Sequence, residues 1–151
     1  MFYQSFTPLE RLINLEDSEV REAVKISQKV NSADRFTSYA KVLALRILQG
    51  WLKQEGFALE IESMESFLNG ASTLGSSTIN LRFLSLRFCL IPTFSFSDDP
   101  TDEIMDILET EETLSLHTAD FFVVIAIEND LQVGGIKGCI NRHSLSKIYN
   151  G

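Results

Sequence analysis

One of the two histidines, His117, precedes Asp120 by three residues, and a His–Asp pair with a serine is the arrangement of a hydrolase triad. The candidate serines are Ser72 and Ser115. Ser72 lies in residues 70–75 (GASTLG), which hold one residue too many between the glycines for a GxSxG nucleophile elbow. We therefore expect no catalytic residues, and we predict surface or capping roles for both histidines.

Acidic side chains gather in residues 95–112 (SFSDDPTDEIMDILETEE), which invites a calcium site. A calcium loop that starts at Asp98 needs Asp or Asn at its third and fifth positions and Gly at its sixth. The chain has Pro100, Asp102 and Glu103 there, and a start one residue later fails as well. We expect no bound metal in this acidic block, with a loose cation site as the alternative.

The glycine cluster at residues 134–138 (GGIKG) resembles a phosphate-binding loop only superficially. It lacks the GK[ST] of a Walker loop and the GxGxxG of a dinucleotide-binding turn, so we expect structural glycines and no cofactor. Cys89 and Cys139 lie in apolar stretches without CxxC spacing. They predict buried thiols rather than a disulfide framework, which fits a reducing cytosol.

Charge is distributed unevenly along the 151 residues, whose net charge is −8. Residues 88–136 contain 11 acids and no Lys or Arg, whereas the remainder contains 10 acids and 13 bases. Nucleic-acid binding needs a concentrated basic face, so we expect no nucleic-acid partner. No apolar run reaches the ~18 residues that span a membrane, and the N-terminus does not read as a signal peptide. These features predict a cytoplasmic protein.

The element that must position the rest is a long helix predicted over residues 32–56. Ser32 is placed to cap its first amides, and Gly56 is placed to end it in the left-handed conformation. Its apolar residues cover roughly two-thirds of the circumference, more than the ~100° stripe of a surface helix. The helix therefore needs two neighbours, a sheet and another helix. Its central apolar face comprises Phe36, Ala40, Leu43, Ile47 and Trp51.

The second helix is predicted to start at Asp17 or Ser18, which cap its positive end. A short loop joins it to the long helix, which favours an antiparallel helix pair. Residues 1–15 are too apolar for a free tail. Pro8 and the apolar residues after it predict a helical turn that docks on the body of the protein.

Alternating apolar residues in the middle of the chain predict three strands, at residues 57–62, 79–83 and 84–90. The alternation changes parity between Phe83 and Leu84, which predicts a bulge or a tight bend. We expect Pro92 to end the third strand and residues 64–68 to form a helical turn.

Residues 121–128 (FFVVIAIE) are apolar at both parities, which indicates a central strand. Asn129–Asp130 predicts a two-residue hairpin turn into a strand over residues 131–140. The glycines in that strand predict bulging or the close approach of another backbone. Within the acidic block, Thr101 is placed to cap a short helix that starts at Asp102.

The order of these pieces resembles an uncharacterised cyanobacterial family, one of the domain-of-unknown-function families. The similarity covers roughly residues 20–143. Its motifs are structural and lie at residues 39–52 with Glu55-Gly56-Phe57, at 63–78, at 86–92, at 121–128 and at Gly134-Gly135-Ile136. Family members often carry a glycine or proline turn between the two middle strands, where this sequence has Phe83-Leu84-Ser85. The resemblance implies a cyanobacterial cytoplasmic protein and transfers no activity.

Together these features predict one α+β domain over residues 1–151, in which an antiparallel sheet of four or five strands packs on a helix pair with one long central helix. We expect a non-catalytic protein–protein interaction module: an adaptor, assembly factor or small chaperone for a cyanobacterial complex, such as a carboxysome or photosynthetic assembly. Its partner would be another protein or its peptide tail, or a second copy in a homodimer. The alternative is a small-molecule sensor or minor enzyme, with a pocket between helix and sheet lined by Phe, Trp51 and Tyr39.

The long helix carries a narrow cationic stripe that faces away from its apolar arc. Three interpretations of the stripe are open: a solvated face, a surface covered by the acidic block, or a binding surface for a partner. The third is considered because oppositely charged patches select partners. The candidate partner-binding residues are Arg35, Arg46 and Lys53 on the stripe and Asp98, Asp99, Asp102 and Glu103 in the acidic block.

Overall fold

The computed structural model describes residues 3–5, 12–71, 78–94, 119–128 and 130–141. Its elements are β1 (Tyr3–Ser5), β2 (Ile13–Asn14), α1 (Asp17–Ser27), the short 3-10 helix η2 (Ser32–Asp34), α2 (Arg35–Gln54), α3 (Met64–Ala71), β3 (Ile79–Phe83), β4 (Leu86–Thr93), β5 (Phe121–Glu128) and β6 (Val133–Asn141). The acidic block with Asp98, Asp99, Asp102 and Glu103, the helix predicted within it, and both histidines lie outside the described residues.

The strands form one mixed sheet in the order β1-β6-β5-β4-β3, with β2 paired to β6 on the same edge as β1. β4 and β5 run parallel, with Leu90 opposite Val123, whereas the other pairs are antiparallel. The predicted all-antiparallel sheet is therefore wrong at its centre. Parallel neighbours need a connection of a dozen or more residues, which residues 94–120 provide. Alternation along a strand reports its buried face and not its direction.

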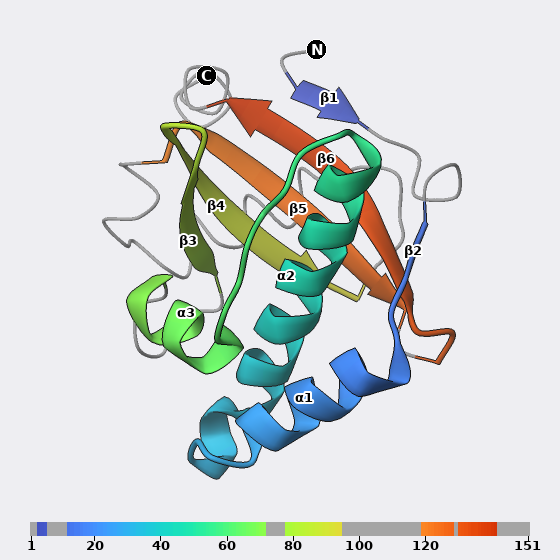
Figure 1. Cartoon of the computed structure of the whole chain (residues 1–151), viewed down its shortest axis with the longest axis vertical. Helices are drawn as coiled ribbons and strands as arrows, with labels where there is room; N and C mark the ends of the chain where they lie inside the picture. Colours follow the sequence, from blue (N-terminus) through green and yellow to red (C-terminus); the bar gives the residue numbers. More distant parts are fainter. Residues whose placement is uncertain (1–2, 6–11, 72–77, 95–118, 129, 142–151) are drawn as a thin grey trace.

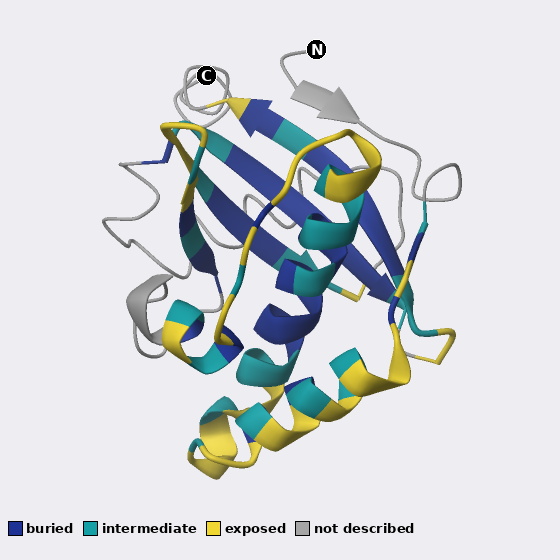
Figure 2. Ribbon diagram, viewed as in Figure 1, coloured by how far each residue is buried: buried dark blue, intermediate teal, exposed yellow. Residues whose placement is uncertain are grey.

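The α+β class is confirmed, and α2 is the helix that lies on the sheet. Figure 1 shows α2 crossing one face of the sheet, α1 packed obliquely on α2, and α3 beside β3. Figure 2 shows the buried residues concentrated in the sheet and the middle of α2, while α1 keeps an exposed outer side. None of the described helices is both long and apolar enough to cross a membrane.

The ends of α2 differ from the prediction at the start and agree with it at the stop. Asn31, not Ser32, provides the cap, and it caps η2, the 3-10 turn that leads into α2, because its Oδ1 accepts a hydrogen bond from the Asp34 N–H at 3.2 Å. The buried residues of α2 begin at Ala40, so Phe36 on the first turn lies beyond the core and is 65% exposed. Gly56 follows the helix with φ +89°, the left-handed conformation expected of it.

Residues 57–62 were predicted as a strand, but they form an extended segment that pairs with no strand in the described part of the chain. The segment runs from the end of α2 down to α3 (Figure 1). The Gln49 amide on α2 donates a hydrogen bond to the Leu59 carbonyl at 2.8 Å, and Leu59 is buried. The alternation therefore indicates an extended chain with one side packed against α2. Such a pattern arises without pairing in a sheet.

β5 is the central strand, as predicted, and its residues from Phe122 to Ile127 are buried. The bulging and close approach predicted from the glycines of β6 are both present. The register between β5 and β6 shifts at Val124 and Ile125. A Cβ at Gly134 would lie 2.6 Å from the Ala126 carbonyl oxygen and against the side chain of Ile47. Only glycine fits there without displacing β5 or α2.

Three further predictions need correction. Ile13 lies in β2, which pairs with β6, so the helical turn predicted there is wrong at its end. Pro92 lies inside β4 rather than ending it. The first residue of β3, Ile79, lies opposite Leu90, so β3 does not extend as far as Pro92. The side of Pro92 that lacks an N–H therefore faces no described strand, which is where a strand tolerates proline. The turn before β6 is longer than two residues, because Glu128 pairs with Val133.

Candidate functional site

An apolar groove of about 280 Å³ opens between the second half of α2 and the end of the sheet where β3 turns into β4. The described side chains that line it are apolar apart from the Cys139 thiol and the Trp51 indole N–H, and none of them is charged. They are Leu48, Trp51, Leu52 and Phe57 on the helix side, and Leu81, Phe83, Leu84, Leu86, Phe88, Phe121, Val123, Ile136 and Cys139 on the sheet side. Tyr39, which the small-molecule hypothesis placed in such a pocket, is not among them.

Aromatic rings form two walls of this groove. The ring of Phe57 meets that of Phe83 edge-on with centroids 6.3 Å apart, and the rings of Phe88 and Phe121 stack at 5.6 Å. Both arrangements are favourable for aromatic quadrupoles. Trp51, the single tryptophan of the chain, lines the groove from α2 and is therefore a spectroscopic reporter for it.

The β3–β4 hairpin presents an apolar tip at the mouth of the groove. Its turn residues, Leu84 and Ser85, have φ values of +53° and +65°, which identifies the tight bend predicted from the parity change. A two-residue turn with positive φ at both positions is of type I′, for which Asn-Gly is a preferred sequence. Here the first position is Leu84, which is 63% exposed, and Leu86 beside it is 40% exposed.

The opposite face of the same hairpin is basic. Arg82 on β3 stands directly opposite Arg87 on β4. Asp120, just before β5, accepts a hydrogen bond from the Arg87 backbone N–H at 2.9 Å, and its carboxylate lies 3.7 Å from the Arg87 Nε. The Asp120 N–H in turn donates to the Arg87 carbonyl at 2.8 Å. The Asp120 carboxylate thus connects the start of β5 to β4. Among the described residues it forms an ion pair with Arg87 and none with Arg82.

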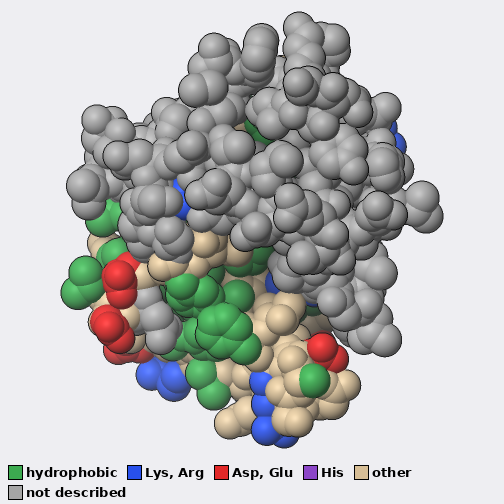
Figure 3. Space-filling view, turned by 180° about the vertical axis from the view of Figure 1, so that it is seen from behind, with side chains coloured by type: hydrophobic (Ala, Val, Ile, Leu, Met, Phe, Trp, Pro, Cys, Tyr) green, Lys and Arg blue, Asp and Glu red, His purple; other side chains and the backbone are tan. Residues whose placement is uncertain are grey.

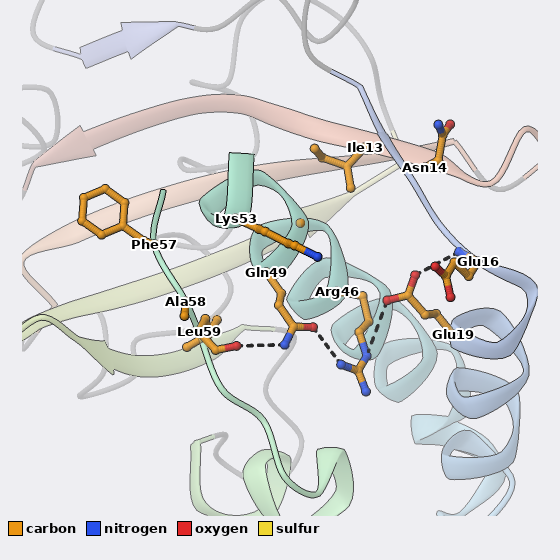
Figure 4. A pocket seen from close by; sticks show the side chains of 11 residues that line it. Ile13, Asn14, Glu16, Glu19, Arg46, Gln49, Lys53, Phe57, Ala58 and Leu59 are labelled. Carbon is orange, nitrogen blue, oxygen red and sulfur yellow. Dashed lines mark hydrogen bonds and ion pairs between the residues drawn. The ribbon is translucent and has the colours of Figure 1, made fainter. Parts of the chain in front are cut away.

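A second cavity of about 450 Å³ lies on the other side of α2, between that helix, β2 and residues 57–59. This polar cleft contains two of the predicted partner-binding residues, Arg46 and Lys53 (Figure 4). In Figure 4 the Lys53 ammonium points into the cleft, whereas the Phe57 ring points away from it. The described residues that line it are Ile13, Asn14, Glu16, Glu19, Arg46, Gln49, Gly50, Lys53, Phe57, Ala58 and Leu59.

Arg46 is held by α1 and by its own helix. Its Nε and Nη2 donate to Glu22 Oε1 at 3.1 and 2.8 Å, and its Nη1 donates to Gln49 Oε1 at 2.7 Å. The Glu19 carboxylate lies 3.9 Å from Nε, and the Arg46 side chain is only 17% exposed. Gln49 continues the chain of hydrogen bonds to the Leu59 carbonyl. The network therefore ties α1, α2 and the 57–62 segment together.

The other predicted partner-binding residues are separated in space from this network or lie outside the described residues. Arg35 is exposed and donates from Nε to the Val30 carbonyl at 3.4 Å, at the far end of α2 from the cleft. The four acidic candidates belong to the part of the chain that the structure does not describe. The structure thus brings Arg46 and Lys53 to one cleft, and the partner-binding role of all seven residues stays a prediction.

A further apolar feature joins the start of α2 to the end of β4. The rings of Phe36 and Phe94 lie 5.1 Å apart, and both are exposed. Seen from behind, the described part of the surface shows hydrophobic side chains gathered in its lower half, beside acidic ones (Figure 3). Sequence periodicity did not identify Phe36, Leu84 or Leu86 as surface residues. Each belongs to the apolar pattern of its helix or strand, but lies at an end of that element that extends beyond the core.

Among the described residues, the thiols and carboxylates offer neither a cluster for a metal ion nor, at Cys139, an ionised thiol. Neither Cys89 nor Cys139 forms a disulfide with a described residue, and burial raises the pKa of the Cys139 thiol to about 11. A thiol with that pKa is protonated at neutral pH and is a poor nucleophile. No group of three or more His, Cys, Asp or Glu among the described residues is arranged to hold a metal ion.

Comparison with known proteins returned no similar family model, no similar curated protein and no similar solved structure.

Proposed function

We propose that this protein is a non-catalytic interaction module that receives the apolar side chains of a protein partner in the groove between α2 and the sheet. The observation that carries the proposal is Leu84, a large apolar residue in the left-handed conformation at an exposed hairpin tip. Left-handed backbone costs a non-glycine residue about 1–2 kcal/mol. Such an outlier supports a functional role for the residue that adopts it.

The lining of the groove favours a protein partner over a small molecule. Small-molecule pockets enclose roughly 300–1,000 Å³ and contain a few polar groups that orient the ligand. This groove encloses about 280 Å³, and among the described residues that line it only Cys139 and Trp51 carry a heteroatom in the side chain. Its apolar surface also continues outward over Leu84 and Leu86. A molecule confined to the cavity would leave these residues in water, whereas a protein surface would cover them.

The kind of module follows from the same features. An apolar receiving site whose described side chains carry no charge suits an adaptor, an assembly factor or a small chaperone that holds a partner during assembly. The resemblance to a cyanobacterial family suggests a cyanobacterial complex as the setting. Leu84, Leu86 and Trp51 are then the residues expected to contribute most to binding, since buried aromatic and aliphatic anchors dominate interface energies.

A second candidate function is the binding of a small polar molecule, and the polar cleft favours it. The cleft encloses about 450 Å³, within the usual range of ligand pockets, and both signs of charge line it. A thermal-shift screen of polar metabolites tests this function: a stabilising metabolite should lose its effect in Lys53→Met and keep it in Leu84→Asn. A metabolite whose effect survives Lys53→Met does not bind through the cleft as proposed.

The experiment for the main proposal uses the double variant Leu84→Asn/Ser85→Gly. Asn-Gly is the preferred sequence for this turn, so the variant should unfold at a higher denaturant concentration than the original. It should also retain less of any specific partner in quantitative affinity capture from a cyanobacterial lysate, because the apolar tip is gone. A gain in stability together with a loss of binding is a result that misfolding does not produce.

Leu131→Asn is the matched control, because Leu131 is an equally exposed leucine in the turn before β6 and does not line the groove. A protein that is lost with the double variant and retained with Leu131→Asn supports the proposal. A protein that binds the double variant as well as the original does not use the hairpin tip, and that result refutes the proposal.

A further inference from the structure

β3 is the outermost strand of the described sheet on the side away from β1, and β4 is its one strand neighbour there. The two-residue turn determines which of its backbone groups are available. Phe83 and Leu86 close the hairpin, and a closing pair of this kind exchanges both of its hydrogen bonds. Hydrogen bonding alternates along an antiparallel ladder, so Leu81 also bonds to β4. The N–H and C=O groups of Asn80 and Arg82 therefore point outward from the sheet.

The side chains of β3 alternate between two chemically different faces. Leu81 and Phe83 line the apolar groove on the face covered by α2. Arg82 lies between them in sequence and so projects to the opposite face, where it stands beside Arg87. The edge therefore offers backbone hydrogen-bonding groups with an apolar face on one side and a cationic face on the other.

Among the described residues, the cationic face contains two arginines but an acidic partner for only one of them. Like charges directly opposite each other in a sheet are destabilising, and Arg82 and Arg87 form such a pair. Asp120 neutralises Arg87 through the contacts described above. Arg82 is exposed and makes no ion pair with any described residue. A carboxylate supplied from outside the described part of the chain would complete this pair.

We infer that the partner adds an extended strand to the edge of β3, with alternating apolar and acidic side chains. This inference rests on the proposed function and specifies the partner segment. Its apolar side chains lie beside Leu81 and Phe83 at the groove, and an acidic side chain lies beside Arg82. Its backbone bonds to the outward groups of Asn80 and Arg82, as in other cases of strand addition.

Charge complementarity excludes a second copy of this chain as the occupant. Two β3 edges paired antiparallel would bring both copies of Arg82 and Arg87 onto one face of the joined sheet. Charged residues on edge strands are a known means of preventing such self-pairing. Arg82 repels the β3 edge of a second copy and attracts an acidic strand. This one residue therefore disfavours self-pairing and favours the acidic partner.

The test uses a fluorescein-labelled eight-residue peptide of alternating Val and Glu, and a matched peptide of alternating Val and Lys. Fluorescence anisotropy should show that the Glu peptide binds and that the affinity of the Lys peptide is lower by about fivefold or more. This factor corresponds to the energy of a cross-strand charge pair. Arg82→Glu should reverse this preference. A variant that binds both peptides as the original does overturns the inference about charge.

Amide hydrogen exchange tests the backbone pairing directly. In the free protein, the outward amides of Asn80 and Arg82 should exchange faster than those of Leu81 and Phe83, which bond to β4. Saturating Glu peptide should slow exchange at Asn80 and Arg82 and leave Leu81 and Phe83 as they were. Asn80→Pro removes one outward donor without removing a bond to β4, so it should weaken peptide binding about fivefold or more while the protein stays folded.

The variants distinguish failure of this inference from failure of the proposed function. If Leu84→Asn/Ser85→Gly weakens peptide binding but Asn80→Pro and Arg82→Glu do not, the groove binds the peptide without strand addition, and only the inference fails. If none of the variants affects a peptide that binds, the peptide lies elsewhere and the inference fails. If neither peptide binds at millimolar concentration and exchange at Asn80 and Arg82 is unchanged, the edge does not accept a strand.

Discussion

The ring of Phe57 meets the ring of Phe83 edge-on, with centroids 6.3 Å apart, and this contact joins the segment after α2 to the outer strand of the sheet. Phe57 also lines both cavities, one on each side of α2. Its position depends on two short-range features, namely the left-handed Gly56 before it and the hydrogen bond from its N–H to the Leu52 carbonyl at 2.9 Å. The groove is therefore bounded by a ring that the end of α2 holds in place.

Phe57→Ala should open the groove with a modest loss of stability. Phe57 is 46% exposed, so we expect about 1–2 kcal/mol rather than the 3–5 kcal/mol of a buried phenylalanine. The emission of Trp51 should move to longer wavelength, because water gains access to the groove. Urea unfolding and tryptophan fluorescence measure the two effects. Phe36→Ala is the control, since Phe36 is an exposed ring remote from Trp51, and it should leave the emission unchanged.

Arg46→Met should destabilise the fold by about 1–3 kcal/mol, because Glu22 and Gln49 lose the donors that satisfy them in a partly buried site. Arg35→Met is the comparison, since Arg35 is exposed and its hydrogen bond to the Val30 carbonyl is long at 3.4 Å; the substitution should change stability by about 0.5 kcal/mol or less. Urea denaturation of both variants measures the difference. Equal effects would show that the network around Arg46 contributes no more than an ordinary surface residue.

Gly134→Ala should be among the most damaging single-methyl substitutions in the chain. The new Cβ would lie 2.6 Å from the Ala126 carbonyl oxygen, which belongs to the central strand, so we expect a loss of about 1–3 kcal/mol or more. Adding Ile47→Val should restore little, because the clash with the Ala126 backbone remains. Complete recovery in the double variant would place the strain in the Ile47 contact alone. Thermal unfolding measures both variants.

Cys139 should make stability fall as pH rises above about 9. Burial raises the pKa of its thiol to about 11 from the ordinary 9.0, so between these values the unfolded chain ionises while the folded protein stays protonated. The unfolded state then binds fewer protons, and stability decreases with pH by up to about 2–3 kcal/mol for two units. The stability of Cys139→Ala should lack this component. Urea unfolding of both proteins at pH values from about 8 to about 11 measures the difference, and parallel pH profiles would contradict the prediction.

Local patterns were sufficient for several elements. The double apolar parity of β5 identified the central strand, since a strand covered on both faces needs apolar residues at every position. The change of parity after Phe83 located the β3–β4 bend, because two turn residues separate Phe83 from Leu86, which pair and lie on the same face of the sheet. The glycines of β6 indicated close backbone approach, which Gly134 makes with Ala126. Each of these signals arises within a few residues of where its consequence lies.

The groove was not predictable in the same way. Its lining comes from α2, the segment after it and four strands, and those strands are neighbours only because β4 and β5 pair in parallel. Alternation also misassigned residues 57–62, because α2 buries one side of an extended chain as effectively as a sheet does. Arg46 illustrates the same limit, since its place in a cationic stripe suggested a partner, whereas Glu22 on α1 supplies a counter-charge within the chain.

The amino-acid sequence by itself determined the α+β class, the central strand, the long helix with its left-handed end at Gly56, and the sites where the backbone must bend or lie close to another. These depend on side-chain period and on the conformational limits of single residues. The tertiary structure alone decided the strand order, the direction of β4 relative to β5, and which apolar side chains stay at the surface. Those outcomes depend on contacts between residues far apart in the chain, and a local pattern carries no information about them.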